Sequence, residues 1–233
     1  MSHTNPFREI TRGICTCLEQ PSGASYDFKA GYYERLVSTR WFNRFFWDAS
    51  RQDYQEFASR AILRTAGTVL DVGCGGLAQT AQLYRSTNND CILLDRSLEM
   101  LKIARARLWA GSGLLPANIQ LLQGDAFRLP FPDNTFDTVC SFGTIHLFDN
   151  KQEFVDKVLS VLKPGGRFYF YSMTGETKIS RAFMSSLRKV REFGNVYSIA
   201  QTLALFNQPA LEVQSHVIGS VVFIAGRKIK QSV

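Results

Sequence analysis

The chain has 233 residues, of which 45% are hydrophobic and 20% are charged, as in an ordinary soluble globular protein of one domain, with or without a small cap. No apolar run approaches the roughly 20 residues needed to cross a bilayer, and no apolar signal segment opens the chain, so we expect a cytoplasmic protein without a membrane span. The formal net charge of +7 favours anionic partners, such as nucleic acid, anionic lipid or an acidic substrate.

Two segments precede the predicted core. Residues 1–25 mix polar residues, Gly and Pro without a period, and are predicted to form an irregular leader or arm. Residues 26–64 are rich in aromatic residues and are predicted to form a helical cap, since apolar residues recur at helical spacing from Tyr54 to Ile62. We interpret this cap either as a helix packed on the edge of a sheet or as a lid over a bound ligand.

The predicted core, residues 65–233, opens with a strand at 69–72, a glycine-rich turn and a helix starting near Ala78. Glycines allow a tight turn and a close approach to a ligand, and a helix that begins there points free N–H groups into the same space. The next strand ends at Asp95, roughly 20 residues after the glycines, which is the offset of a carboxylate that binds ribose hydroxyls. This arrangement predicts a nucleoside site.

Strands and helices alternate through the rest of the core, which predicts a mostly parallel sheet with right-handed crossovers. The last two strands follow each other without a helix and are predicted to form an antiparallel hairpin. The seven predicted strands are 69–72, 91–95, 119–122, 136–142, 167–171, 210–213 and 220–225. An insert at about 174–197 contains a basic amphipathic helix.

Four motifs follow one another along the chain: Val69-Leu-Asp-Val-Gly-Cys-Gly75, Leu94-Asp-Arg-Ser-Leu-Glu-Met-Leu101, Gly124-Asp-Ala126 with Leu129-Pro-Phe-Pro-Asp-Asn-Thr-Phe-Asp137, and Leu162-Lys-Pro-Gly-Gly-Arg167. In this order they resemble the class I S-adenosylmethionine (SAM) methyltransferases, in the small single-domain branch that includes the ubiquinone and menaquinone methyltransferases. The resemblance covers roughly residues 26–228. It implies a doubly wound, seven-stranded α/β sheet with an antiparallel last strand and an N-terminal helical cap.

The resemblance also implies SAM as the cofactor and gives roles to residues at the strand ends. The Gly73–Gly75 backbone, which includes Cys74, would approach the methionine and ribose parts of SAM, and Asp95 would accept both ribose hydroxyls. Asp125 and the Ala126 N–H would hold the adenine edge. The remaining predicted cofactor residues are Asp71 under the turn, Arg96 at the adenine rim or in solvent, Ser141 and Phe142 at the methionine end, and Tyr33 in the cap.

One position departs from the family pattern Gly-x-Gly-x-Gly. The third glycine falls one position early, as Gly76, and Leu77 follows it. Leu77 would then lie near the methionine end of SAM, so we expect a distorted turn or a tighter pocket.

His146 follows the fourth predicted strand and is the one histidine next to the predicted site. It is interpreted either as a base or orienting group for the methyl acceptor, or as a packed histidine hydrogen-bonded to the backbone. Cys15 and Cys17 lack further ligands to complete a zinc site, so no metal is expected. The basic helix is interpreted as a solvated face or as the rim of a pocket that draws anionic or membrane-borne substrates by peripheral contact.

The leading hypothesis is methyl transfer from SAM to a small or lipid-like acceptor. The aromatic residues of the cap favour an acceptor that is flat or apolar. A second hypothesis is an RNA methyltransferase, favoured by the net charge of +7. Because the chain shows no appended RNA-binding module, stable nucleic-acid binding is not expected. A third is a non-catalytic SAM-binding protein, suggested by the displaced glycine.

Overall fold

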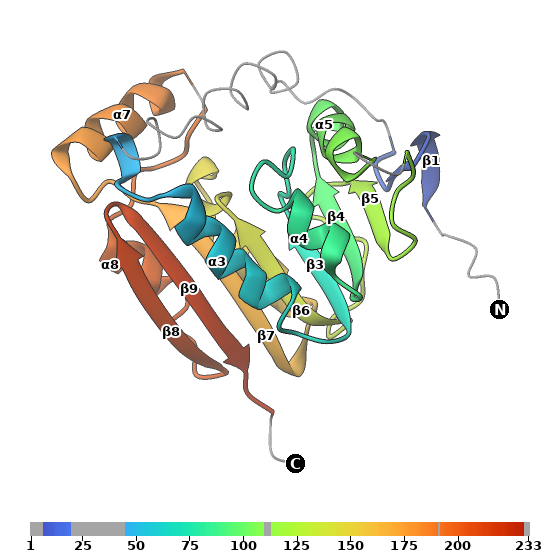
Figure 1. Ribbon diagram of the computed structural model, residues 1–233. Helices are drawn as coiled ribbons and strands as arrows, with labels where there is room; N and C mark the ends of the chain where they lie inside the picture. The colour runs from blue at the N-terminus through green and yellow to red at the C-terminus, as the bar shows by residue number, and fades with distance from the viewer. Residues whose placement is uncertain (1–6, 20–44, 110–112, 191, 231–233) are drawn as a thin grey trace.

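A single nine-stranded sheet runs through the molecule (Figure 1). The computed structural model describes residues 7–19, 45–109, 113–190 and 192–230. The strand order is β1-β2-β5-β4-β3-β6-β7-β9-β8. The strands are β1 Arg8–Thr11, β2 Ile14–Thr16, β3 Thr68–Val72, β4 Asp90–Asp95, β5 Ile119–Gln123, β6 Phe136–Phe142, β7 Leu162–Met173, β8 Leu211–Ile218 and β9 Val221–Lys228.

The strand directions confirm the predicted α/β class with a mostly parallel sheet. Neighbouring strands from β2 to β7 are all parallel. β9 runs antiparallel to both β7 and β8, as predicted for the closing hairpin. Because ligands of open parallel sheets bind at the carboxyl ends of the strands, this topology places a site where β3, β4, β5 and β6 end.

The predicted number of seven strands is wrong, since β1 and β2 extend the sheet beyond β5. Both lie in the segment that we expected to be an irregular leader. They are joined at Gly13, whose φ of 77° suits a tight turn and whose N–H donates to the Glu9 carboxylate at 2.7 Å. Ile14 is completely buried where β2 pairs with β5. Strands of four and three residues are too short to show an alternating pattern.

Helices cover both faces of the sheet and complete a three-layer fold. The helices are α3 Arg51–Ile62, α4 Ala81–Ser86, α5 Leu98–Trp109, α6 Lys151–Ser160, α7 Lys178–Lys189 and α8 Ile199–Ala204, with a 3₁₀ turn η1 at Ile145–Leu147. Residues of α3, α4 and α5 share one hydrophobic core, and residues of α6 share a second core with Leu205 and Phe206, which follow α8. In the described part of the chain, no helix is both long and apolar enough to cross a bilayer.

Helix α3 forms most of the described part of the predicted cap, residues 45–64. It begins with a capping box formed by Ser50 and Asp53, and its buried face consists of Tyr54, Phe57, Ala58, Ala61 and Ile62, as the spacing predicted. The earlier part of the cap, which includes Tyr33, lies outside the described residues.

Helix α4 begins at Ala81, three residues after the predicted start. Residues 78–80 form a turn before it, and the Ala81 N–H donates to the Leu77 carbonyl at 3.1 Å.

Helix α7 lies in the predicted insert, at the upper left of Figure 1. Its predicted apolar stripe is buried only in part. The Phe183 ring packs on Phe46, with ring centroids 4.1 Å apart, whereas Ile179 and Val190 are 51% and 57% exposed. The stripe is longer than the surface available to cover it, so its two ends remain in solvent.

Candidate functional site

A cavity of about 370 Å³ opens at the carboxyl ends of β3, β4, β5 and β6. Four segments supply most of its wall: Gly73–Thr80, Leu94–Ser97, Gly124–Phe127, and Phe142–Phe148 without Ile145. This volume is within the usual range for sites that bind cofactors or drug-sized ligands, about 300–1,000 Å³. The cavity therefore lies where the topology predicts a ligand.

The glycine turn after β3 is tied to the end of β4. The N–H groups of Gly73 and Cys74 donate to the Leu94 carbonyl at 2.8 and 3.0 Å. The Gly75 N–H donates to the Asp95 carboxylate at 2.8 Å, and the Ser97 N–H donates to its other oxygen at 2.8 Å. These two hydrogen bonds hold the Asp95 carboxylate at the edge of the cavity.

Leu77 occupies the third glycine position of the family pattern. Its φ of 58° is in the left-handed region, so the backbone there keeps the conformation that a glycine would adopt. For a residue with a Cβ this conformation costs roughly 1–2 kcal/mol. The side chain is 2% exposed and lines the cavity. The departure thus narrows the cavity, as expected, while the positive φ is kept.

The two glycines at the centre of the turn differ in their surroundings. A Cβ at Gly73 would lie 2.6 Å from the Thr144 side chain, whereas one at Gly75 would meet nothing within 4 Å. Both residues have positive φ, so alanine costs roughly 1–2 kcal/mol of backbone strain at either position. We expect Gly73→Ala to lower the free energy of unfolding by about 1 kcal/mol more than Gly75→Ala, the cost of overpacking.

Urea denaturation measures this difference. In the Gly73→Ala background, Thr144→Ala removes the two nearest clashing atoms and should recover part of the loss. Equal stabilities of the two single variants would show that Thr144 does not crowd the turn.

Asp125 and Arg96 form an ion pair at the rim of the cavity. An Arg96 guanidinium nitrogen lies 2.9 Å from one Asp125 oxygen, and the Phe127 N–H donates to the other oxygen at 2.9 Å. The Arg96 side chain is 64% exposed, so it sits at the mouth, the rim position that we had considered for it. Because exposed ion pairs contribute little, typically under about 1 kcal/mol, the pair can open when a ligand approaches Asp125.

Most of the predicted cofactor residues share this cavity. Those that line it are Gly73, Cys74, Gly75, Asp95, Arg96, Asp125, Ala126 and Phe142, and His146 lines it as well. Asp71 and Ser141 do not line it, and both are buried residues of strands β3 and β6.

Asp71 is a buried carboxyl group two residues before the glycine turn. The Tyr84 hydroxyl donates to one oxygen at 2.8 Å, and the other oxygen has no partner in the described structure. Burial and, to a lesser extent, the nearby charge of Asp95 raise the pKa of Asp71 to about 7. Asp71 therefore acts from beneath the turn and does not face the cavity.

His146 lies in the η1 turn with 2% of its surface exposed. Its ring packs against the Phe193 ring at 4.5 Å, and neither ring nitrogen has a hydrogen-bond partner among the described residues. A histidine hydrogen-bonded to the backbone, our second interpretation, does not match this geometry. Burial, together with the charge of Lys151, lowers the pKa of His146 to about 3, so the ring is neutral near neutral pH.

Several lining residues escaped the sequence reasoning. Tyr54 was predicted only as part of a core helix face, yet it also lines the cavity with a buried hydroxyl that has no partner in the described structure. Tyr171 and Met173 come from the end of β7, and Glu192 comes from the insert. Their only signal was a position near a strand end or in the insert, which does not distinguish a lining residue from its neighbours.

Comparison with known proteins agrees with this fold. Residues 70–170 match the family model described as a methyltransferase domain. This match agrees with the family resemblance that the motifs indicated.

Among its curated relatives is the ubiquinone/menaquinone biosynthesis C-methyltransferase UbiE of Pseudomonas putida, which is 35% identical over 125 residues. That match covers 52% of this chain and 48% of UbiE, so the chain spans about half the length of the curated relatives it matches.

Solved structures of low sequence identity share the fold. The [4+2]-cyclase SpnF is 15% identical with a TM-score of 0.69, over 88% of this chain and 94% of its own. An O-methyltransferase family protein from Burkholderia thailandensis is 15% identical with a TM-score of 0.68, over 92% of this chain and 66% of its own. Because a cyclase is among them, the fold alone does not define the reaction.

Proposed function

We propose that the protein transfers a methyl group from SAM to a small, flat and largely apolar acceptor, at a ring carbon activated by a hydroxyl group. The observation that carries this proposal is the position of Asp95, which is bonded to the Gly75 N–H at the edge of a cavity with an apolar wall. The similarity to a quinone-pathway C-methyltransferase supports the choice of acceptor class.

The residues around the turn fit the proposed cofactor. Open space lies next to Gly75, where a Cβ would meet no atom within 4 Å. Asp95 would bind the ribose hydroxyls, and Asp125 with the Ala126 N–H would bind the adenine after Arg96 moves aside. Bound SAM would supply a methyl group on a sulfonium, ready for in-line displacement. The chain's own task is then to orient the acceptor and exclude water.

Aromatic side chains form the wall assigned to the acceptor. The rings of Phe142 and Tyr171 stack with centroids 5.6 Å apart, and the ring of Tyr54 lies 4.9 Å from that of Tyr171. All three residues line the cavity. Offset packing against such rings favours a planar ligand.

His146 is assigned to the hydroxyl group of the acceptor. Its unpartnered nitrogens are buried, so a hydroxyl that donates to one of them would satisfy a group that is otherwise desolvated at a cost. The low pKa makes it a weak base. We therefore propose that it orients the hydroxyl and takes its proton only as the carbon–carbon bond forms.

His146→Phe should reduce the turnover number by at least about 100-fold, the lower end of acid–base contributions, because phenylalanine keeps the packing on Phe193 and removes both nitrogens. The dissociation constant of SAM should stay within about twofold, since His146 is assigned to the acceptor. Phe193→Leu is the control, because it alters the same packing and keeps the nitrogens. Turnover equal to wild type would make His146 a packing residue.

The proposed function is tested by incubating the protein with methyl-labelled SAM and a panel of hydroxylated aromatic and quinol compounds. We expect the label in one class of acceptor, with one equivalent of S-adenosylhomocysteine per methyl group transferred. Absence of SAM binding by calorimetry would contradict the proposal. Label in RNA would favour the nucleic-acid hypothesis, and SAM binding without turnover on the panel or RNA would favour a non-catalytic role.

A further inference from the structure

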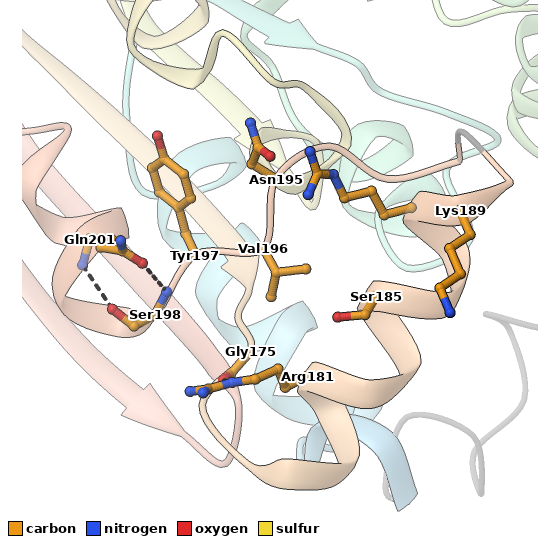
Figure 2. Close-up of a pocket in the computed structure, with 10 residues that line it drawn as sticks. Gly175, Arg181, Ser185, Lys189, Asn195, Val196, Tyr197, Ser198 and Gln201 are labelled. Carbon is orange, nitrogen blue, oxygen red and sulfur yellow. Dashed lines mark hydrogen bonds between the residues drawn. The ribbon is translucent and has the colours of Figure 1, made fainter.

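A second cavity, of about 680 Å³, lies between α7 and the segment from Asn195 to Gln201 (Figure 2). None of the residues placed around it also lines the cofactor cavity. The two walls are joined at one end, where the Gly175 N–H donates to the Tyr197 carbonyl at 2.9 Å. This second cavity is thus a separate, built feature of the insert.

Its α7 wall is basic. Arg181, Arg188 and Lys189 line it together with Ser185, and these positions recur at the spacing of one helix face. The opposite wall is neutral and mostly polar, and Figure 2 shows Asn195, Tyr197 and Ser198 on it. No aspartate or glutamate is among the described residues of the lining.

One of these cations is held in position. The Arg181 Nε–H donates to the Gly175 carbonyl at 2.9 Å, which holds the side chain next to Gly175 (Figure 2). None of Arg181, Arg188 and Lys189 has an ion pair within the parts of the chain described. The interpretation of this helix as a purely solvated basic face explains neither the concave wall nor the anchored guanidinium. Three cations that line one cavity also repel each other, and a bound anion would offset this repulsion.

From this geometry we infer that the second cavity binds a phosphate-type anion, carried either by a free phosphorylated ligand or by a lipid headgroup. Phosphate matches the donors, because guanidinium groups bind its oxygens in pairs and lysine adds a point charge. Ser185 and Asn195 add neutral hydrogen-bonding groups around the same space. The inference stands whether or not the cofactor cavity supports methyl transfer.

Inorganic pyrophosphate is the probe for this site, titrated by calorimetry at constant ionic strength against sodium chloride. We expect saturable binding to the wild-type chain. The double variant Arg188→Gln/Lys189→Gln should bind at least about tenfold more weakly, the effect of about 1.4 kcal/mol. Both side chains are exposed and make no ion pair in the described structure, so their removal should leave folding intact.

Lys178→Gln is the matched control, because Lys178 is an exposed cation of the same helix that does not line the cavity. Its affinity for pyrophosphate should stay within about twofold of wild type. No saturable binding, or equal weakening by the control and the double variant, would overturn the inference. SAM affinity, measured without pyrophosphate, should be unchanged in all variants and reports separately on the proposed function.

Vesicles that contain phosphatidic acid distinguish the source of the phosphate group. Vesicle binding that the double variant abolishes and Lys178→Gln retains would assign the site to a lipid headgroup. Pyrophosphate binding without vesicle binding would assign it to a free phosphorylated ligand. Vesicle binding that the wild type and both variants show equally, together with no saturable pyrophosphate binding, would contradict a phosphate site in this cavity.

Discussion

Asp95→Ala is expected to weaken SAM binding by about 100-fold. The carboxylate is assigned to both ribose hydroxyls, and a hydrogen bond to a charged group contributes about 1.5–3 kcal/mol. The substitution also frees the N–H groups of Gly75 and Ser97, which the carboxylate now accepts at 2.8 Å each. The loss therefore combines missing contacts to the ligand with a less ordered turn. Calorimetric titration with SAM measures it.

Asp95→Asn separates these two causes. Asparagine keeps one oxygen that can accept from Gly75 or Ser97, but it has no negative charge and only one acceptor oxygen. We expect an affinity between those of wild type and Asp95→Ala, with a smaller loss of stability in urea. An Asp95→Ala protein that binds SAM within about threefold of wild type would refute the ribose assignment.

Asp71→Asn is expected to make the cofactor-free protein more stable at pH 8 than the wild type. Burial raises the pKa of Asp71 from 3.8 to about 7, so between these values the folded state holds a proton that the unfolded state has lost. Stability of the wild type should then fall as the pH rises through this window. One pKa unit corresponds to about 1.4 kcal/mol, so the free energy of unfolding of Asp71→Asn at pH 8 should exceed that of the wild type by up to about 4 kcal/mol. Near pH 4 the two proteins should be about equal.

Tyr84→Phe provides the control for Asp71. The Tyr84 hydroxyl donates to the carboxylate and lowers the pKa of Asp71. Its removal should raise that pKa, so the fall in stability should extend to higher pH. Urea denaturation in steps from pH 4 to pH 8 measures all three proteins. An identical pH dependence for wild type and Asp71→Asn would show that Asp71 is not the titrating group.

The parts of the fold with strong local signals were predictable. Strands β3 and β4 are apolar runs that end in a glycine turn and in Asp95, so their type and the place of the site followed from spacing. β2 could not be found, because it pairs with β5, which lies about 100 residues later in the chain, and β1 in turn pairs with β2. The positive φ at Leu77 was also hidden, since no sequence pattern marks a leucine as left-handed.

Side-chain direction explains why one predicted cofactor residue, Ser141, misses the cavity. Successive residues of a strand point to opposite faces, so Ser141 is buried while Phe142 reaches the cavity. A motif at a strand end gives the place of the site, but it does not say which of two neighbours faces the ligand. Tyr171 and Glu192 join the site from distant segments, so only the folded chain shows them together.

The segment from Glu192 to Tyr197 contributes to both the cofactor cavity and the second cavity. Glu192 lines the cofactor cavity, Phe193 packs on His146, and the Gly194 N–H donates to the His146 carbonyl at 3.1 Å. Asn195 and Tyr197, which follow in the chain, line the second cavity. A ligand that shifts this segment when it binds in one cavity must alter the affinity of the other cavity for its own ligand. By thermodynamic reciprocity, the two affinities change by the same factor. The binding of SAM in one cavity and of an anion in the other would thereby be coupled through the six residues from Glu192 to Tyr197.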